Sequence, residues 1–279
     1  MKAVILAGGL GSRLSEETQL VPKPMVRIGE APMLWHIMKF YASYGIRDFV
    51  ICLGYKGHVI QEYFYNYRFR SSDVTINTRT QEIIFHKNDS DDWNVTLVHT
   101  GDKSMTGGRL KRIKPHVDDT FCMTYGDGLS DVDLTELIEF HHTHGKLATV
   151  TAVSPPGRFG QLKVEEDRTV STIIEKPDTG DSVINGGFFV LEPCVLDFID
   201  GDGTIWERAP MEYLAQKGDL KAYLHGGFWH PMDTLRDKEY LESLWISGTA
   251  PWAVWKNAEK KPADVIVLGK KKYSIKTSH

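Results

Sequence analysis

The chain has 279 residues, of which 41% are hydrophobic and 25% charged, a composition typical of a folded globular protein. Its 33 lysines and arginines against 37 aspartates and glutamates give a formal charge of −4, which argues against nucleic-acid or anionic-membrane partners. Three widely spaced cysteines imply neither a disulfide framework nor a zinc motif. Because no cleavable leader or bilayer-spanning apolar run is found, we expect a cytoplasmic protein.

The first half of the chain alternates short apolar runs with amphipathic stretches. We predict strands at 3–7, 48–54 and 121–124, and helices at 33–44, 59–67 and 134–141. Asp133 and Glu136 are the expected capping pair of the last helix. Such alternation is typical of βαβ units around a parallel sheet, whose ligands lie at the carboxyl ends of the strands.

The second half is mixed. We predict strands at 147–153, 162–165, 170–175, 184–193 and 220–223, and helices at 209–217 and 236–245. Residues 68–94 are polar, poorly periodic and long for a plain connection, which indicates a functional or interaction surface. The lysine-rich tail from Lys256 has no role that its residues suggest.

The first predicted strand ends in a glycine-rich loop, "LAGGLGSRL" (residues 6–14). It is not a dinucleotide fingerprint, because Leu14 stands where the third glycine would be, and no Walker A pattern is present. An ordinary βα turn is the alternative. The loop nevertheless offers a phosphate unobstructed backbone N–H groups, a hydroxyl and a guanidinium, from Gly8, Gly9, Gly11, Ser12 and Arg13.

Three further positions could meet a phosphate or a metal ion. Lys23 stands between two prolines that stiffen its backbone, although a solvated lysine is the alternative. Asp127 follows an apolar strand in "TYGDG", where it could bind Mg²⁺ or simply make a turn. Asp233 directly precedes a helix in "WHPMDTLRD", where it is either a helix cap or a second magnesium ligand.

Two more segments can each be interpreted in two ways. In "IIEKP", Glu175 could accept hydrogen bonds from sugar hydroxyls while Lys176 meets a phosphate, or the two could form a surface ion pair. "TGGRLKR" (106–112) is either a nucleotide contact or the start of a helix with a solvated basic face.

Taken together, these segments resemble the sugar-phosphate nucleotidylyltransferase family over roughly residues 1–255. The resemblance rests on the order and spacing of "LAGGLGSRL", "PKPM", "GDG", "IIEKP" and "MDT". Longer stretches, such as "PMLWHIMKFY", "MTGGRLKR" and "FWHPMDTLRDKEYLE", resemble the branch that transfers a cytidylyl group from CTP to glucose 1-phosphate. A thymidylyl- or uridylyltransferase acting on a hexose 1-phosphate is the alternative activity, and a non-catalytic sugar-nucleotide sensor is a remote one.

The resemblance implies an α/β fold with a Rossmann-like, mixed, mostly parallel sheet flanked by helices. It implies one domain over 1–255, with a nucleotide-binding half at about 1–145 and a sugar-phosphate half at about 146–255, followed by an extension (256–279) of unknown role. The polar segment 68–94 resembles the subunit-contact region of cytidylyltransferases, which implies a homo-oligomer such as a hexamer.

The resemblance also implies roles for individual residues. Arg13, Lys23 and Asp127 would act in catalysis, and Asp127 and Asp233 would share Mg²⁺. Leu6, Gly8, Gly9, Gly11, Ser12, Arg13, Lys23, Thr106, Gly107 and Arg109 would bind the nucleotide. Gly160, Glu175, Lys176, Asn185 and Gly186 would bind the sugar phosphate. The chain departs from the family at Ser12, where threonine is usual, and at Val21, where close relatives often carry lysine.

Overall fold

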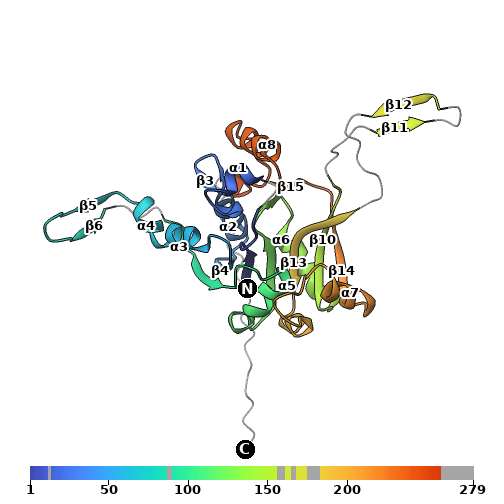
Figure 1. The fold of residues 1–279 in the computed structure, drawn as a ribbon, viewed down its shortest axis with the longest axis horizontal. Helices are drawn as coiled ribbons and strands as arrows, with labels where there is room; N and C mark the ends of the chain where they lie inside the picture. Colours follow the sequence, from blue (N-terminus) through green and yellow to red (C-terminus); the bar gives the residue numbers. More distant parts are fainter. Residues whose placement is uncertain (12–13, 87–89, 156–160, 165–167, 175–182, 259–279) are drawn as a thin grey trace, which may run out of the picture.

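The computed structural model describes residues 1–258 except 12–13, 87–89, 156–160, 165–167 and 175–182. A mixed seven-stranded sheet forms the centre of this described part (Figure 1). Across the sheet, the strands are β14 (Leu220–His225), β10 (Ala148–Val153), β13 (Ile184–Leu191), β8 (Phe121–Tyr125), β1 (Lys2–Leu6), β4 (Asp48–Leu53) and β7 (Asn94–His99).

The sheet is mostly parallel, as the sequence predicted. Strand β1 pairs in parallel with both β4 and β8, and the β4–β7 and β10–β14 pairs are also parallel. Strand β13 is the exception, because it runs antiparallel to its neighbours β8 and β10. One sheet therefore runs through both predicted halves of the chain. The limits of 1–255, 1–145 and 146–255 remain predictions.

Alternate residues of the central strands contribute to two separate cores. Ala3 and Ile5 of β1 belong to one core, whereas Val4 and Leu6 belong to the other. This division follows from the strand period of two, which sends successive side chains to opposite faces of the sheet. Helices α2 (Met33–Ser43), α6 (Leu134–His144) and α8 (Leu235–Ile246) supply the first core, and α5 (Thr106–Arg112) and α7 (Ala209–Gln216) the second.

The remaining elements are short. The helices are α1 (Ser15–Thr18), α3 (Gly57–Tyr65), α4 (Tyr67–Arg70) and α9 (Trp255–Ala258), and 3₁₀ turns span Lys23–Met25, Lys114–His116 and Pro193–Phe198. Paired strands are β2 (Arg27–Ile28) with β3 (Ala31–Pro32), β5 (Val74–Ile76) with β6 (Ile83–Phe85), β9 (Gly128–Ser130) with β15 (Trp229–Pro231), and β11 (Gln161–Val164) with β12 (Val170–Ile174). None of the helices in the described ranges is long and apolar enough to cross a bilayer.

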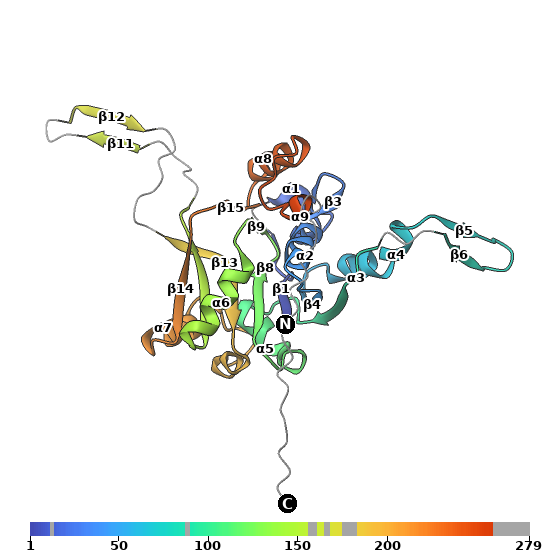
Figure 2. The same ribbon diagram turned by 180° about the vertical axis from the view of Figure 1, so that it is seen from behind.

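The segment that lacked a periodic pattern contains ordered elements. Strands β5 and β6 form a hairpin that extends away from the body of the molecule beyond α3 and α4 (Figures 1 and 2). Each strand has three residues, which is too short for a hydrophobic period to be visible in the sequence. Phe69 and Phe85 stack edge to face at 6.2 Å where the hairpin begins.

The predicted capping pair of α6 is half observed. The Asp133 carboxylate accepts hydrogen bonds from the backbone N–H groups of Thr135 and Glu136, as an N-cap should. The Glu136 side chain does not turn back to the cap, however, because its Oε2 accepts a hydrogen bond of 2.9 Å from the Tyr223 hydroxyl. A tertiary contact has therefore replaced the local one.

Helix α9 packs against α2, and α8 packs against β2, although these elements are far apart in the sequence. Several tryptophans surround the buried His36 of α2 here. His36 Nε2 lies 2.9 Å from the Ile28 carbonyl, and Trp252 Nε1 lies 3.3 Å from His36 Nδ1. Burial lowers the pKa of His36 from 6.5 to about 4, so this imidazole is neutral at pH 7.

Candidate active site

The glycine-rich loop and the "GDG" turn lie at the same edge of the sheet. Leu6 of β1 pairs with Tyr125 of β8, and because the strands are parallel, both segments leave the sheet side by side. They border a cavity of about 310 Å³. Its lining residues are Leu6, Ala7, Gly8, Gly9, Gly11, Lys23, Pro24, Ser104, Met105, Thr106, Arg109, Tyr125, Gly126 and Asp127.

Two glycines of the loop are needed for its shape. A Cβ atom at Gly8 would lie 2.2 Å from Arg109 Nη1, and one at Gly11 would lie 2.8 Å from Thr18 Cγ2. Gly11 also has a φ of +64°, which side-chain-bearing residues rarely adopt. At Gly9 nothing lies within 4 Å of an added Cβ, so bulk there would point into open space. Ser12 and Arg13 lie outside the described residues.

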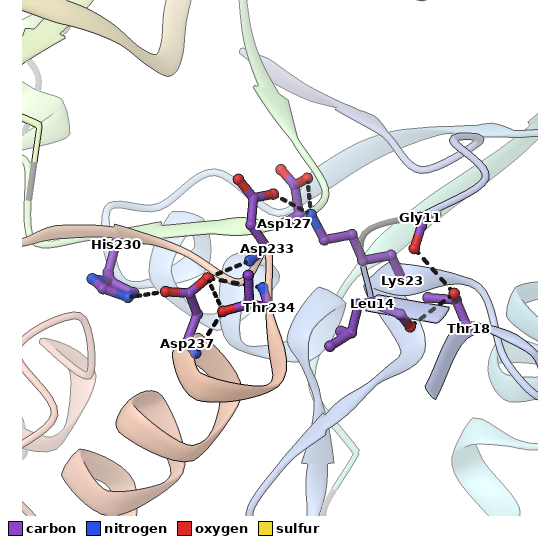
Figure 3. A network of polar contacts seen from close by, with 9 residues as sticks. All are labelled: Gly11, Leu14, Thr18, Lys23, Asp127, His230, Asp233, Thr234 and Asp237. Atoms are coloured by element: carbon purple, nitrogen blue, oxygen red, sulfur yellow. Dashed lines mark hydrogen bonds and ion pairs between the residues drawn. The ribbon is translucent and has the colours of Figure 1, made fainter. Parts of the chain in front are cut away.

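Lys23 lies at the centre of a charged cluster below this loop (Figure 3). Its Nζ is 2.7 Å from Asp127 Oδ2 and 2.8 Å from Asp233 Oδ1. Burial alone would lower the pKa of Lys23, but the two carboxylates outweigh burial and raise it above its ordinary value. The alternative of a solvated surface lysine is therefore wrong, because this side chain is buried and paired twice.

Asp233 is not the cap of α8. Thr234 is the N-cap, and it forms a capping box in which Asp237 accepts from the Thr234 backbone N–H while Thr234 Oγ1 accepts from Asp237 N. Asp237 Oδ1 also lies 3.1 Å from His230 Nε2 (Figure 3). Local helix capping is thus satisfied by the next residue, and the Asp233 carboxylate contacts Lys23 from the opposite half of the chain.

The donor set at this cluster suits a hard cation such as Mg²⁺. Asp127 and Asp233 both reach one ammonium nitrogen, so their carboxylates converge on a single point. Mg²⁺ typically takes one or two protein carboxylates and completes its shell with water and substrate phosphates. Within the described ranges, no group of three or more His, Cys, Asp or Glu side chains could hold a metal by itself. A magnesium site of two carboxylates, completed by water and substrate phosphates, needs no such group.

Arg109 also lines the cavity, next to Gly8 of the loop. Its Nη1 donates to the Gly101 carbonyl at 2.7 Å and to Thr100 Oγ1 at 2.9 Å, and its Nη2 donates to the Gly8 carbonyl at 2.8 Å. A third contact of Nη1 reaches the Leu53 carbonyl at 3.2 Å. The guanidinium therefore binds together the segments that follow three neighbouring strands of the sheet, β1, β4 and β7.

The basic side chains at the end of helix α5 are exposed, and they also contact a neighbouring segment. Arg112 forms a paired contact with Asp202, and Lys111 Nζ donates to the carbonyls of Ile199 and Asp200 at 2.7 Å each. Gly107 packs so closely that an added Cβ would lie 2.7 Å from the Thr204 carbonyl oxygen. These contacts attach α5 to residues 199–204, and Thr106 at its start faces the cavity.

On the predicted sugar side, Asn185 and Gly186 lie on β13. Asn185 Nδ2 lies 3.3 Å from the Tyr125 hydroxyl, and Trp229 Nε1 donates to the Gly186 carbonyl at 2.6 Å. Gly160, Glu175 and Lys176 lie outside the described residues. Sequence reasoning did not single out Tyr125 or Glu207, which join Asn185 to the cavity wall. The only available signal for Tyr125 was its position two residues before Asp127.

The fold and the site define an α/β protein that presents phosphate-binding groups at the carboxyl edge of a mixed sheet. Residues 2–217 match the family described as Nucleotidyl transferase, and the chain belongs to that family.

Among curated relatives, "Glucose-1-phosphate cytidylyltransferase" from Salmonella typhi is 58% identical over 91% of this chain and 100% of the relative. "Probable glucose-1-phosphate cytidylyltransferase" from Bacillus subtilis is 43% identical over the same shares of each chain. A solved structure of HddC from Yersinia pseudotuberculosis aligns with a TM-score of 0.64 at 22% identity, covering 88% of this chain and 99% of that one. The last likeness supports the fold alone.

Proposed function

We propose that this protein transfers a cytidylyl group from CTP to α-D-glucose 1-phosphate and produces CDP-glucose and pyrophosphate. The observation that carries the base and the sugar is the 58% identity to the Salmonella typhi relative over its whole length. The observation that supports catalysis is the Lys23–Asp127–Asp233 cluster beside the glycine loop. A protein that only sensed sugar nucleotides would not need this cluster.

In the proposed reaction, a phosphate oxygen of glucose 1-phosphate attacks the α-phosphorus of CTP. The new P–O bond forms as the bond to the β-phosphate oxygen breaks, and pyrophosphate leaves with that electron pair. The nucleophile is already anionic at neutral pH, so no side chain has to remove a proton. Catalysis then depends on alignment and on stabilising negative charge, as in other phosphoryl-type transfers.

Different residues of the chain align the substrates and stabilise the negative charge. The N–H groups of Gly8, Gly9 and Gly11, with Ser12 and Arg13, cradle the triphosphate, and Lys23 neutralises charge at the reacting phosphates. Thr106, Gly107 and Arg109 form the nucleotide wall. On the sugar side, Glu175 binds sugar hydroxyls, Lys176 binds the sugar phosphate, and Asn185, Gly186 and Gly160 complete the subsite.

Asp127 and Asp233 would hold Mg²⁺. When bound, the ion supplies positive charge to the phosphate oxygens and orients them. Lys23 contacts both carboxylates, so its positive charge offsets part of their negative charge within the cluster. We expect the lysine to exchange these contacts for phosphate oxygens when CTP enters.

The proposal is tested by measuring pyrophosphate release with glucose 1-phosphate and Mg²⁺ against CTP, UTP, dTTP, ATP and GTP in parallel. Release with CTP at a kcat/KM at least tenfold above the other nucleotides is the expected result. Preferred release with dTTP or UTP would replace the proposed base while keeping the reaction class. Silence with all five nucleotides, repeated with a panel of hexose 1-phosphates, would overturn the enzymatic proposal.

We further propose that the protein is a homo-oligomer, such as a hexamer, assembled through the β5–β6 hairpin. Exposed apolar side chains gather on and beside this hairpin, namely Tyr65, Phe69, Ile76, Ile83 and Ile84. An extended hairpin carrying such residues is typical of a subunit contact. Light scattering of the intact chain tests this, and a monomer at micromolar concentration would contradict it.

The cysteines support a reducing compartment. Cys52, Cys122 and Cys194 all carry free thiols, and the first two are buried in the two different cores of the sheet. We therefore assign the protein to the cytoplasm, where thiols stay reduced.

A further inference from the structure

Glu207 joins two residues of the cavity wall from outside the cavity. This residue precedes α7 and accepts hydrogen bonds at both of its carboxylate oxygens. Thr106 Oγ1 donates to Oε2 at 2.6 Å, and the Tyr125 hydroxyl donates to Oε1 at 2.5 Å. Both donors line the cavity. Glu207 is not among the described residues that line it. Glu207 therefore acts on the cavity through its two partners.

The two partners face different sides of the site. Thr106 begins α5 on the nucleotide side, and its Oγ1 also accepts from the Trp206 backbone N–H at 2.9 Å. Tyr125 ends β8, and its hydroxyl lies 3.3 Å from Asn185 Nδ2 on the predicted sugar side. One carboxylate thus connects α5, β8 and β13.

The chemistry of the donors fixes the direction of each hydrogen bond. A hydroxyl has one proton, so Tyr125, having given it to Glu207, can only accept from Asn185. That orients the Asn185 amide, whose Oδ1 in turn accepts from Gly187 N at 2.8 Å.

The backbone at Gly187 is built around the same tyrosine. Gly187 has a φ of +79°, and a Cβ atom there would lie 2.5 Å from Tyr125 Cδ2. The backbone of β13 therefore lies close to the Cδ2–Cε2 side of the ring, and Glu207 accepts a hydrogen bond from its hydroxyl. A hydroxyl held at this end cannot rotate to offer a proton elsewhere.

We propose that Glu207 is a positioning residue that holds Thr106 on the nucleotide side and the Tyr125–Asn185 pair on the sugar side in one fixed arrangement. The inference rests on the proposed function for the identity of the two ligands. A carboxylate is required because both neighbours are donors, and charge-assisted hydrogen bonds to a carboxylate are stronger than neutral ones. An amide at this position can accept at one atom only.

The test is steady-state kinetics of Glu207→Gln with the KM for CTP and for glucose 1-phosphate measured separately. We expect both KM values to rise at least fivefold. Tyr125→Phe should raise only the KM for glucose 1-phosphate, and Thr106→Val only the KM for CTP. The matched control is Glu212→Gln, the same change at an exposed position of α7, which should leave both KM values unchanged.

A double variant separates positioning from a general loss of structure. If Glu207 acts through Tyr125, Glu207→Gln combined with Tyr125→Phe should raise the KM for glucose 1-phosphate no more than the larger single effect. Multiplied effects, or a lower Tm with both KM values unchanged, would overturn the proposal. If Glu207→Gln fails to fold, the opposite selectivities of Tyr125→Phe and Thr106→Val carry the same test.

Calorimetric titration with CTP and Mg²⁺ distinguishes failure of the Glu207 proposal from failure of the proposed function. A wild-type protein that binds CTP but does not turn over glucose 1-phosphate would overturn the proposed sugar. Glu207→Gln should still weaken CTP binding at least fivefold in that case, and unchanged binding would overturn the positioning role. If the wild-type protein binds no CTP, the proposed function and the inference that rests on it both fall.

Discussion

Two buried cations face the same cavity, but their partners are of opposite kinds. Lys23 is 7% exposed and contacts two carboxylates, those of Asp127 and Asp233. Arg109 is 5% exposed, and its guanidinium donates to three backbone carbonyls and one hydroxyl. Charged side-chain partners can be exchanged for a phosphate or a metal ion. Carbonyl partners belong to the backbone, and losing them would disturb the loops themselves.

Under the proposed function, this difference separates a residue that acts on the substrate phosphates from one that supports the loops. Lys23 is stiffly presented by two prolines, yet its ionic partners allow it to change ligands as substrate charge arrives. Arg109 holds the Gly8 carbonyl against the carboxyl ends of β4 and β7, so it shapes the glycine loop. We therefore expect changes at Lys23 to affect turnover first and changes at Arg109 to affect stability first.

The largest expected effect is on turnover at the ionic cluster. Lys23→Met and Asp127→Asn should each lower kcat about 10²–10³-fold, equivalent to about 2.7–4 kcal/mol of transition-state stabilisation. The physical reason is that each removes a charge that stabilises the reacting phosphates or holds their metal ion. Pyrophosphate release measures kcat, and circular dichroism verifies that the fold is kept.

Lys39→Met is the matched control for Lys23→Met. Lys39 also forms an ion pair, with Asp91 at 2.8 Å, but it lies on α2 away from the cavity. Its loss should change kcat less than twofold. Near-normal turnover in Lys23→Met would remove the proposed role of that residue.

The next effect is on stability. Arg109→Met should lower the free energy of unfolding by about 3 kcal/mol, because buried carbonyls such as that of Gly8 lose a charged donor. Urea unfolding measures it. The control, Arg112→Met, removes an exposed guanidinium from Asp202 and should cost far less. A fully stable Arg109→Met protein that fails only in CTP binding would show that Arg109 acts mainly on the ligand.

A third buried basic group, His36, extends the comparison because its partners are neutral. Its pKa is lowered to about 4 by burial, so the neutral form is favoured in the folded state. Its contribution to stability is present above pH 6.5 and is lost as the pH falls from 6.5 towards 4. From this shift we expect the free energy of unfolding to be about 2 kcal/mol lower at pH 5.

Urea unfolding at pH 7 and pH 5 checks this expectation. Wild type should lose about 2 kcal/mol more than His36→Gln, which keeps an N–H donor towards the Ile28 carbonyl but cannot titrate. Other groups that titrate in this range contribute to both proteins and cancel. Equal losses of unfolding free energy in the two proteins would show that protonation of His36 does not cause the loss of stability.

The smallest expected effect concerns metal binding without nucleotide. The Lys23 ammonium lies between the two carboxylates, where it repels a divalent cation. Lys23→Met should therefore bind Mn²⁺ about tenfold more tightly than wild type, a gain of about 1.4 kcal/mol. Electron paramagnetic resonance of unbound Mn²⁺ measures this. Asp127→Asn should weaken binding, and weaker binding by Lys23→Met would contradict the charge-balance interpretation.

The sequence by itself determined six of the seven strands of the central sheet and the loops at their ends, but not β7. Apolar runs such as 3–7 and 48–54 became buried parallel strands, because such strands are covered on both faces and must be almost wholly apolar. The glycine pattern of residues 8–11 placed a turn of small residues after β1. The "GDG" pattern placed a carboxylate after β8. These are local properties, and local residue chemistry is sufficient to predict them.

Only the tertiary structure decided which partners these residues meet. Lys23 is 104 positions from Asp127 and 210 positions from Asp233, and no spacing rule relates them. Asp233 is not the cap of α8, because Thr234 takes that position. Glu207 carried no signal at all, because an ordinary glutamate acquires its role only when α5, β8 and β13 are brought around it. Distant side chains converge only when the sheet is packed. The sequence therefore indicated which residues to consider, and the tertiary structure showed which of them lie together.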